Sequence, residues 1–342
     1  PNLRDNIGGR MELRLNDPGE SEIDRRAAAA VPVDSPGRAL APDGHQVQIA
    51  QPDLGCGIAE FVAGVGQNWA GDLAPAVRLL PTLVTPAMLP EPGRDPALGV
   101  PIGVDEFELA PVHLDLHGAD PHFVVLGDAE SGKTTVLRSW LSGLQARHGP
   151  NEAMVLVVDY RRTLLGAVAP EQLWAYCGAA PAAESAVQEL AAGIVDRLPP
   201  ATLSATAIAD RSWWTGPDFY VVVDDYDLVV SARGNPVLPL LELLAQGRDL
   251  GLHLIVARRV GGMSRGGMEP VLNRLRELHS SGIILSGDPG EGPVLGTHRA
   301  MTQPPGRGLL VRRKYRPTLV QTVDASQDQA SAPRVSVDQQ TG

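Results

Sequence analysis

The sequence predicts an α/β fold with a mostly parallel sheet flanked by helices. From Pro101 onward, short apolar runs alternate with segments of helical spacing. Strands that are apolar on both faces are typical of parallel sheets covered by helices on both sides. A glycine-rich turn also joins the first run to an amphipathic helix. The predicted strands are HFVVLG (122–127), AMVLVVD (153–159), FYVVVDD (219–225), LHLIVA (252–257), GIILSG (282–287) and GLLVRR (308–313).

The segments outside this region are less regular. Residues 1–52 carry two β-like runs and a short helix around Glu20 to Ala30, and apolar residues at helical spacing predict a helix over 55–70. Proline-rich sequence from Pro75 to Pro101 predicts a connector. We therefore expect a supporting or repeated segment at 1–52, a helix and connector at 53–100, the main domain at 101–323 and a disordered tail at 324–342.

Composition restricts the class of protein. Lys and Arg total 29 against 40 Asp and Glu, and this formal net charge of −11 opposes attraction to nucleic-acid phosphates. Cys56 and Cys177 are too few for a disulfide framework, and none of the eight His has metal-ligand spacing. No signal peptide or membrane-spanning run is predicted, and the chain starts with Pro. We expect a piece of a longer protein in a reducing compartment, with any membrane anchor elsewhere.

The stretch VVLGDAESGKTTVLR predicts a phosphate-binding loop. Gly127, Gly132, Lys133 and Thr134 satisfy the pattern G-x-x-x-x-G-K-[ST] between a predicted strand and a helix. Backbone amides and the helix N-terminus would cradle the phosphates of ATP, with Lys133 on the β- and γ-phosphates and Thr134 on Mg²⁺. This indicates a P-loop NTPase. The predicted ATP-binding residues are Gly127, Asp128, Ala129, Glu130, Ser131, Gly132, Lys133, Thr134 and Thr135.

The apolar run FYVVV ends in two carboxylates that complete the predicted site. Asp224 fits the position that holds Mg²⁺, together with Thr134. Many such ATPases place Glu at the next position to orient the attacking water, but this chain has Asp225. One methylene fewer sets the carboxylate back by about 1.5 Å, and a misplacement near 1 Å can cost about a hundredfold in rate. Binding is therefore predicted more firmly than turnover, and Asp128 and Glu130 must point away from the phosphates.

Other polar and aromatic residues have two interpretations each. Arg258 and Arg259 could each donate to the γ-phosphate or to a neighbouring unit's nucleotide, or they could form structural salt bridges. The pair Trp213–Trp214 could dock a peptide or pack in the core. Asp159, with Arg161 and Arg162, lies at the carboxyl end of a predicted strand, where ligands bind, but a buried charge network that stabilises the loop is the favoured interpretation. The candidate catalytic residues are Lys133, Asp225 and Arg258.

Residues 101 to about 323 resemble the FtsK/SpoIIIE-like ATPases, and among them the EccC-type motors of type VII (ESX) secretion systems. The motifs that carry the resemblance are PIGVDE (101–106), PHFVVLGDAESGKTTVLR (121–138), VVDYRRTLLG (157–166), RSWWTGPDFYVVVDDYDL (211–228), RDLGLHLIVARR (248–259) and PPGRGLLV (304–311). The chain departs from the DNA-pumping branch of this family. Members of that branch usually carry a Thr-Gln-Arg sensor at about the position where this chain has Arg258 and Arg259.

The resemblance implies a RecA/FtsK-like fold and the third, C-terminal ATPase unit of a secretion motor, with ATP and Mg²⁺ as cofactors. It implies a cytoplasmic location within a membrane-associated complex and weak or absent hydrolysis. Implied partners are small helical secreted proteins with C-terminal signals, the preceding ATPase units, a membrane core and further copies in a homo-hexamer. The alternatives are an FtsK-like DNA translocase unit, which the charge disfavours, and a nonhydrolysing, ATP-bound regulatory module that binds peptides.

A repeated motif predicts tandem units independently of the resemblance. The letters DPGE start at Asp17 and again at Asp288, and each copy is followed by PGR, at Pro36 and at Pro305. The separations from Asp to Pro are 19 and 17 residues, and a β-like run follows each copy. Because a shared order of motifs at similar spacing is a sign of repeated units, residues 1 to about 52 are predicted to be the last strands of a preceding ATPase or a layer supporting this one.

Overall fold

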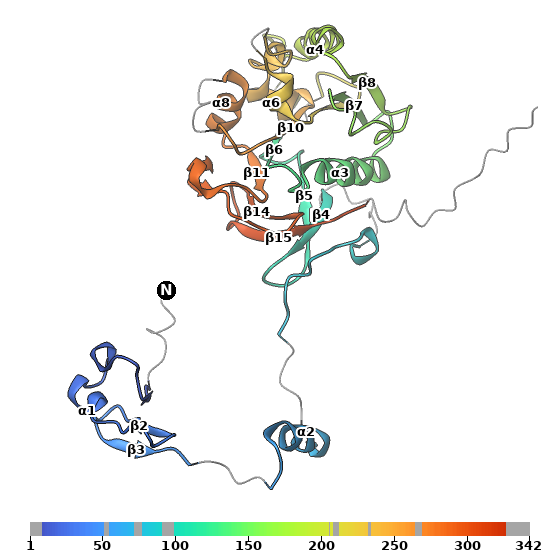
Figure 1. The fold of residues 1–342 in the computed structure, drawn as a ribbon. Helices are drawn as coiled ribbons and strands as arrows, with labels where there is room; N and C mark the ends of the chain where they lie inside the picture. The colour runs from blue at the N-terminus through green and yellow to red at the C-terminus, as the bar shows by residue number, and fades with distance from the viewer. Residues whose placement is uncertain are drawn as a thin grey trace, which may run out of the picture. The chain divides into compact units, whose positions relative to one another are not determined.

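The computed structural model describes residues 9–50, 55–71, 77–90, 99–204, 206–207, 212–231, 234–263 and 269–325. The chain divides into two compact units, residues 1–76 and residues 77–342 (Figure 1). Most of the tail predicted to be disordered, 326–342, lies outside the described residues. Among the described helices, none has the length and apolar character needed to cross a membrane.

The first unit contains a small antiparallel sheet and a separate helix. The sheet has the order β1-β2-β3, and Ala39 and Leu40 of its central strand are fully buried. The helix α2 lies within the predicted range, but the side chains on its apolar face are exposed. The elements are β1 (Glu12–Leu13), a 3₁₀ turn η2 (Pro18–Glu20), α1 (Arg25–Ala29), β2 (Arg38–Leu40), β3 (Gln46–Gln48) and α2 (Ile58–Asn68).

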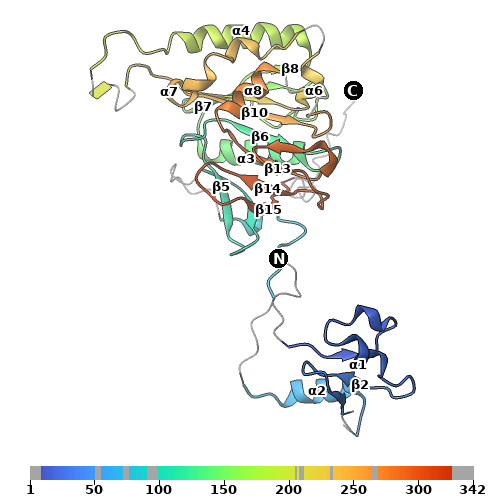
Figure 2. The ribbon, with the colours of Figure 1, turned by 90° about the vertical axis from the view of Figure 1, so that its left-hand side faces the viewer.

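The second unit is built on one ten-stranded sheet with the order β5-β4-β15-β14-β11-β6-β10-β9-β7-β8 (Figures 1 and 2). Neighbours from β11 to β8 pair in parallel, and the pairs from β11 to β5 are antiparallel. The strands are β4 (Val100–Asp105), β5 (Pro111–Leu114), β6 (Phe123–Leu126), β7 (Ala153–Val158), β8 (Leu173–Cys177), β9 (Asp218–Val223), β10 (Leu252–Arg258), β11 (Ser281–Ile284), β14 (Arg307–Val311) and β15 (Thr318–Thr322).

Helices and 3₁₀ turns connect these strands, and a short hairpin follows β11. The helices are α3 (Lys133–Arg147), α4 (Ala180–Val195), α6 (Tyr226–Val229), α7 (Gly247–Leu250) and α8 (Pro270–Glu277). The 3₁₀ turns are η3 (Pro86–Met88), η5 (Leu238–Leu240), η6 (Leu244–Gln246) and η7 (Pro289–Glu291), and the hairpin pairs β12 (Pro293–Leu295) with β13 (His298–Arg299).

Both faces of the sheet are covered, as the apolar strands predict. In β9, Val221 and Val223 pack in a cluster with α4, α6 and α8, whereas Tyr220 and Val222 pack on the other face with α3. The views show α3 on one side of the strands and these three helices on the other (Figures 1 and 2). This alternation explains why the run FYVVV is apolar throughout, since each face of the sheet contacts a helix layer.

The antiparallel edge is where the fold departs from the sequence prediction. The strand predicted over 308–313 forms, but it runs antiparallel to β11. The strands β4, β5, β8 and β15 lie outside the six predicted runs, and β4 begins inside the predicted connector. Gly103 permits the close pairing of β4 with β15, because a Cβ there would lie 2.2 Å from the carbonyl oxygen of Gln321.

The two DPGE motifs have the same local structure. In the first, the Gly19 amide donates to Oδ1 of Asp17 at 2.8 Å, and in the second the Gly290 amide donates to Oδ1 of Asp288 at 2.8 Å. Each aspartate caps a single 3₁₀ turn, η2 or η7. The carboxylate fixes the turn by accepting a backbone hydrogen that would otherwise lack a partner.

The likeness extends through the PGR motifs into the following hairpins. Arg38 pairs with Gln48 across β2 and β3, and Arg307 pairs with Gln321 across β14 and β15. Each glutamine side chain donates at 3.0 Å to the carbonyl oxygen of the motif's proline, Gln48 to Pro36 and Gln321 to Pro305. The glycines of both motifs have positive φ, 80° and 73°. The repeated letters thus mark two copies of one turn-and-hairpin structure.

His122, immediately before β6, gives the large unit a pH-dependent stability. It is fully buried, its Nδ1 accepts from the Leu254 amide at 3.0 Å, and its Nε2 donates to the Leu244 carbonyl oxygen at 2.8 Å. Burial lowers the pKa of His122 to about 4. Below about pH 6.5, the imidazole of His122 is protonated in the unfolded chain but stays neutral in the folded chain until the pH approaches 4. Acidification in this range therefore favours unfolding.

We predict that lowering the pH from 7.5 to 5 reduces the free energy of unfolding through His122 by about 2 kcal/mol. His122→Gln should be less stable than the parent at pH 7.5 but should lose about 2 kcal/mol less on acidification. Urea unfolding followed by tryptophan fluorescence at both pH values measures this. Equal losses in the two proteins would contradict the assignment.

Candidate nucleotide-binding site

The predicted phosphate loop follows β6 and wraps into α3. The Gly127 amide donates to the Arg258 carbonyl oxygen at 3.2 Å, which anchors the loop to the end of β10. A Cβ on Gly127 would lie 2.3 Å from Oγ of Ser131, so the turn requires glycine. Gly132 has a φ of 101° at the N-cap of α3, and the Gly306 amide donates to the Ser131 carbonyl oxygen at 2.9 Å. The PPGRG turn at 304–308 therefore lies against the loop.

Lys133 is the first residue of α3 and is almost fully buried. Its Nζ donates to the carbonyl oxygen of Asp128 at 2.8 Å, so the ammonium group lies inside the curve of the loop. Burial lowers the pKa of Lys133, and the carboxylates of Asp225, Asp224 and Asp227 oppose this shift. The lysine is thus held where it can meet a phosphate.

The acidic residues of the loop do not point at the lysine. The carboxylate of Asp128 accepts from the Gly261 amide at 3.3 Å and from the Asp288 amide at 3.0 Å. Glu130 is exposed, with a φ of 59°. Asp128 therefore joins the loop to the segments after β10 and β11, which removes one negative charge from the path of the phosphates.

The predicted magnesium residues meet at the end of β9. Oγ1 of Thr134 donates to Oδ2 of Asp224 at 2.7 Å, and Oγ1 of Thr163 donates to the same oxygen at 2.9 Å. Asp224 is 1% exposed, and this burial raises its pKa, while the two hydroxyl donors lower it. A buried carboxylate beside a hydroxyl group is a suitable pair of oxygen donors for Mg²⁺.

These residues fit a Mg²⁺–nucleotide. Oγ of Ser131 is buried without a hydrogen-bond partner, so it is available to a bound phosphate group. The nucleotide would supply phosphate oxygens as acceptors for the loop amides and for Lys133. The cation would neutralise phosphate charge, and Thr134 and Asp224 would hold it.

Asp225 occupies the position where a catalytic glutamate is common, and it is already paired. Its Oδ2 lies 2.5 Å from Nε of Arg161, which follows β7. The residue has a left-handed backbone with a φ of 47°. Its carboxylate is thus fixed toward the segment 159–164, where Asp159 accepts from the Leu164 amide at 2.6 Å and from the Tyr176 hydroxyl group at 2.8 Å.

Arg258 and Arg259 have different surroundings. Arg258 is 8% exposed, and its Nε donates to the Arg259 carbonyl oxygen. Burial lowers the pKa of Arg258, while the negative charges of Asp227 and Glu269 oppose this shift. Arg259 lies 3.8 Å from Asp227, and its charge contributes to the lowered pKa of Lys133. Of the two arginines, Arg259 is therefore the one whose charge acts on Lys133.

The tryptophan pair is held by a structural arginine. Nε1 of Trp213 donates to the Arg197 carbonyl oxygen at 2.7 Å, and Nε1 of Trp214 donates to the Asp249 carbonyl oxygen at 2.8 Å. The guanidinium group of Arg197 lies over the Trp214 ring, 4.2 Å from its centroid. These contacts support the packing interpretation, because both indole donors are already used inside the domain.

Sequence reasoning missed Thr163 and Asp227. Thr163 donates to Asp224, the predicted magnesium ligand, but its segment carries no motif that indicates this contact. Only its position after a strand could have suggested it. Asp227 follows Asp224 by three residues in α6, and its charge acts on both Lys133 and Arg258. Both residues come to the site through the ends of neighbouring parallel strands.

A family model described as FtsK/SpoIIIE family matches residues 92–173, which include the phosphate loop and Thr163. The chain belongs to the FtsK/SpoIIIE family. It is 42% identical over 329 residues to the ESX secretion system protein EccC of Thermomonospora curvata, and 44% identical over 313 residues to the ESX-4 secretion system protein EccC4 of Mycobacterium tuberculosis. These alignments cover 94% and 91% of this chain but 25% of each relative, so the chain spans about a quarter of their length.

A solved structure supports the same assignment. Thermomonospora curvata EccC, ATPases 2 and 3 in complex with a signal sequence peptide, is 41% identical, with a TM-score of 0.79. The match covers 94% of this chain and 59% of the other. The predicted P-loop ATPase fold is confirmed, and the family implies nucleotide binding.

We predict that Lys133→Ala abolishes nucleotide retention, with affinity reduced at least a hundredfold, because one cation on the phosphates is lost. The measurement is chromatography of nucleotide released from denatured protein after desalting. The exposed Lys314 provides the matched control, and Lys314→Ala should retain nucleotide as the parent does. Retention by Lys133→Ala would show that the nucleotide lies elsewhere.

Proposed function

We propose that this chain is the C-terminal, ATP-binding unit of a type VII secretion motor. The observation that carries the proposal is the alignment of nearly the whole chain, at 41% identity, with an EccC structure solved with a signal sequence peptide. The contact of Thr134 with Asp224 beside the phosphate loop supports Mg²⁺–ATP as the bound cofactor. The unit recognises the C-terminal signals of small helical secreted proteins and links this binding to its nucleotide state.

Hydrolysis in this unit is weak. In-line attack needs a carboxylate that orients water near the γ-phosphate. Here that position is Asp225, shorter than glutamate by one methylene and paired with Arg161 at 2.5 Å. Thr134 and Asp224 are nonetheless in place for the cation. The arrangement therefore favours a module that holds ATP over one that turns it over rapidly.

Residues 1–52 are the end of a preceding ATPase unit, residues 53–100 form the connector, and 101–323 form the complete domain. The support is the matched structure of the two DPGE turns and their hairpins, in which even the glutamine-to-proline hydrogen bonds correspond. In the full-length protein, we infer that the motor is anchored to a membrane secretion core, with this unit on the cytoplasmic side and copies arranged as a hexamer.

The test of substrate recognition is binding of a labelled C-terminal signal peptide, measured by fluorescence anisotropy with ATP, with ADP and without nucleotide. We predict saturable binding whose affinity changes between the nucleotide states. A peptide with the same residues in scrambled order is the control. Duplex DNA that binds and stimulates hydrolysis would instead support the DNA translocase alternative, and absence of peptide binding would contradict substrate recognition by this unit.

We predict that Asp225→Glu raises the rate of ATP hydrolysis roughly tenfold to a hundredfold, because the longer side chain moves the carboxylate toward the γ-phosphate. Adding Arg161→Gln, which removes the ion pair, should raise the rate further. The measurement is steady-state phosphate release at saturating ATP. Asp43→Glu, an exposed carboxylate of the first unit, is the control, and unchanged rates in all variants would refute the proposed cause.

A further inference from the structure

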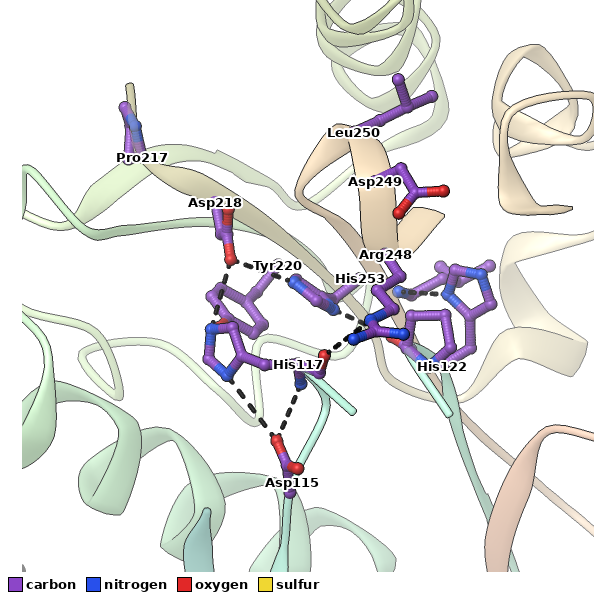
Figure 3. A network of polar contacts seen from close by, with 12 residues as sticks. Asp115, His117, His122, Pro217, Asp218, Tyr220, Arg248, Asp249, Leu250 and His253 are labelled. Atoms are coloured by element: carbon purple, nitrogen blue, oxygen red, sulfur yellow. Dashed lines mark hydrogen bonds and ion pairs between the residues drawn. The ribbon is translucent and has the colours of Figure 1, made fainter. Parts of the chain in front are cut away.

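Three polar side chains from separate segments meet at the N-terminal ends of β9 and β10, whereas the nucleotide site lies at the C-terminal ends of the parallel strands. His117 follows β5, Asp218 is the first residue of β9, and His253 is the second residue of β10 (Figure 3). Because β9 runs from Asp218 to the residue before Asp224, the cluster is about 20 Å from the magnesium carboxylate at 3.3 Å per residue. It is therefore a separate site.

The distances in the cluster match those between ligands of one metal ion. Nε2 of His117 lies 3.2 Å from Oδ2 of Asp218, and Nε2 of His253 lies 3.4 Å from the same oxygen. A tetrahedral zinc ion with bonds of about 2.0–2.1 Å separates its ligand atoms by about 3.3 Å. All three potential ligand atoms lie within 4.8 Å of one another.

The hydrogen bonds of His253 direct a lone pair at the carboxylate. Its Nδ1 lies 3.1 Å from the Pro121 carbonyl oxygen, which can only accept, so Nδ1 carries the hydrogen. When the imidazole is neutral, Nε2 of His253 and Oδ2 of Asp218 are both hydrogen-bond acceptors, so their lone pairs repel each other. A cation between the two atoms replaces this repulsion with two attractive contacts. A histidine whose other nitrogen donates to a backbone carbonyl is typical of metal ligands.

The neighbours of the cluster orient its rings and leave it accessible. The Tyr220 ring stacks on His253 with centroids 4.6 Å apart, and its hydroxyl oxygen lies 3.1 Å from Nε2 of His117. Asp115 lies 3.8 Å from Nδ1 of His117 and can act as an outer carboxylate, while Arg248 donates to the His117 carbonyl oxygen. His253 is 1% exposed, but His117 is 41% exposed, so an ion can enter from solvent.

We propose that His117, Asp218 and His253 bind a divalent transition-metal ion of the zinc type. Two imidazole nitrogens and one carboxylate suit Zn²⁺, whereas Mg²⁺ prefers oxygen ligands only. The three protein ligands leave one position for water. The ion links the segment after β5 to the starts of β9 and β10. It therefore stabilises the end of the sheet that lies away from the nucleotide.

The test is titration of chelator-treated protein with Zn²⁺ by calorimetry, in excess Mg²⁺ so that the nucleotide site does not compete. The proposal predicts one zinc per chain, a higher Tm with zinc, and visible absorption bands of four-coordinate Co²⁺ when cobalt is used. His117→Gln keeps the buried residues intact and should lower zinc affinity at least tenfold and abolish the cobalt bands. Asp218→Asn should do the same.

The control is His45→Gln, since His45 and Asp43 form an exposed pair at 3.2 Å in the other unit. This variant should bind zinc as the parent does, and circular dichroism checks that each variant is folded. No saturable zinc binding, or equal binding by parent and His117→Gln, would overturn the proposal. The cluster would then be a hydrogen-bond network in which a proton, and not a metal, joins His253 to Asp218.

Discussion

The hydrogen bond between Thr134 and Asp224 depends on the parallel registry of three strands. Val256 of β10 pairs with Val124 of β6 on one side and with Val223 of β9 on the other. This registry brings the start of α3 and the end of β9 to one edge of the sheet, where ligands bind in parallel α/β folds. The packing of helices on both faces maintains it, so the chemistry at this edge depends on the apolar core.

The local parts of this architecture could be predicted from the sequence. The phosphate loop is a contiguous motif, and the strand before Asp224 is apolar because both of its faces are buried. The antiparallel half was not predictable to the same extent, since β4 contains Pro101 and Gly103 and its partner β15 lies more than two hundred residues away. Strand pairing at such separation is decided by tertiary contacts, which local propensity does not encode.

The same limit explains what was missed at the sites. The sequence identified Asp225 as unusual but could not show that Arg161 pairs with it, because the two residues come from different strand ends. The cluster around Asp218 contains histidines without a spacing motif, and it forms only because β9 and β10 begin side by side. By contrast, the DPGE repeat was informative because a side-chain cap fixes the same turn in both copies.

In the proposed function, the site combines residues that would hold Mg²⁺–ATP with a constrained carboxylate, Asp225, at the position that would activate water. The most direct test is to incubate the protein with Mg²⁺–ATP, remove free nucleotide, and quantify bound ATP and ADP over time. Our account predicts close to one nucleotide per chain, retained mainly as ATP. Absence of retained nucleotide would contradict the assigned site, and rapid conversion to ADP would contradict the role given to the pair of Asp225 and Arg161.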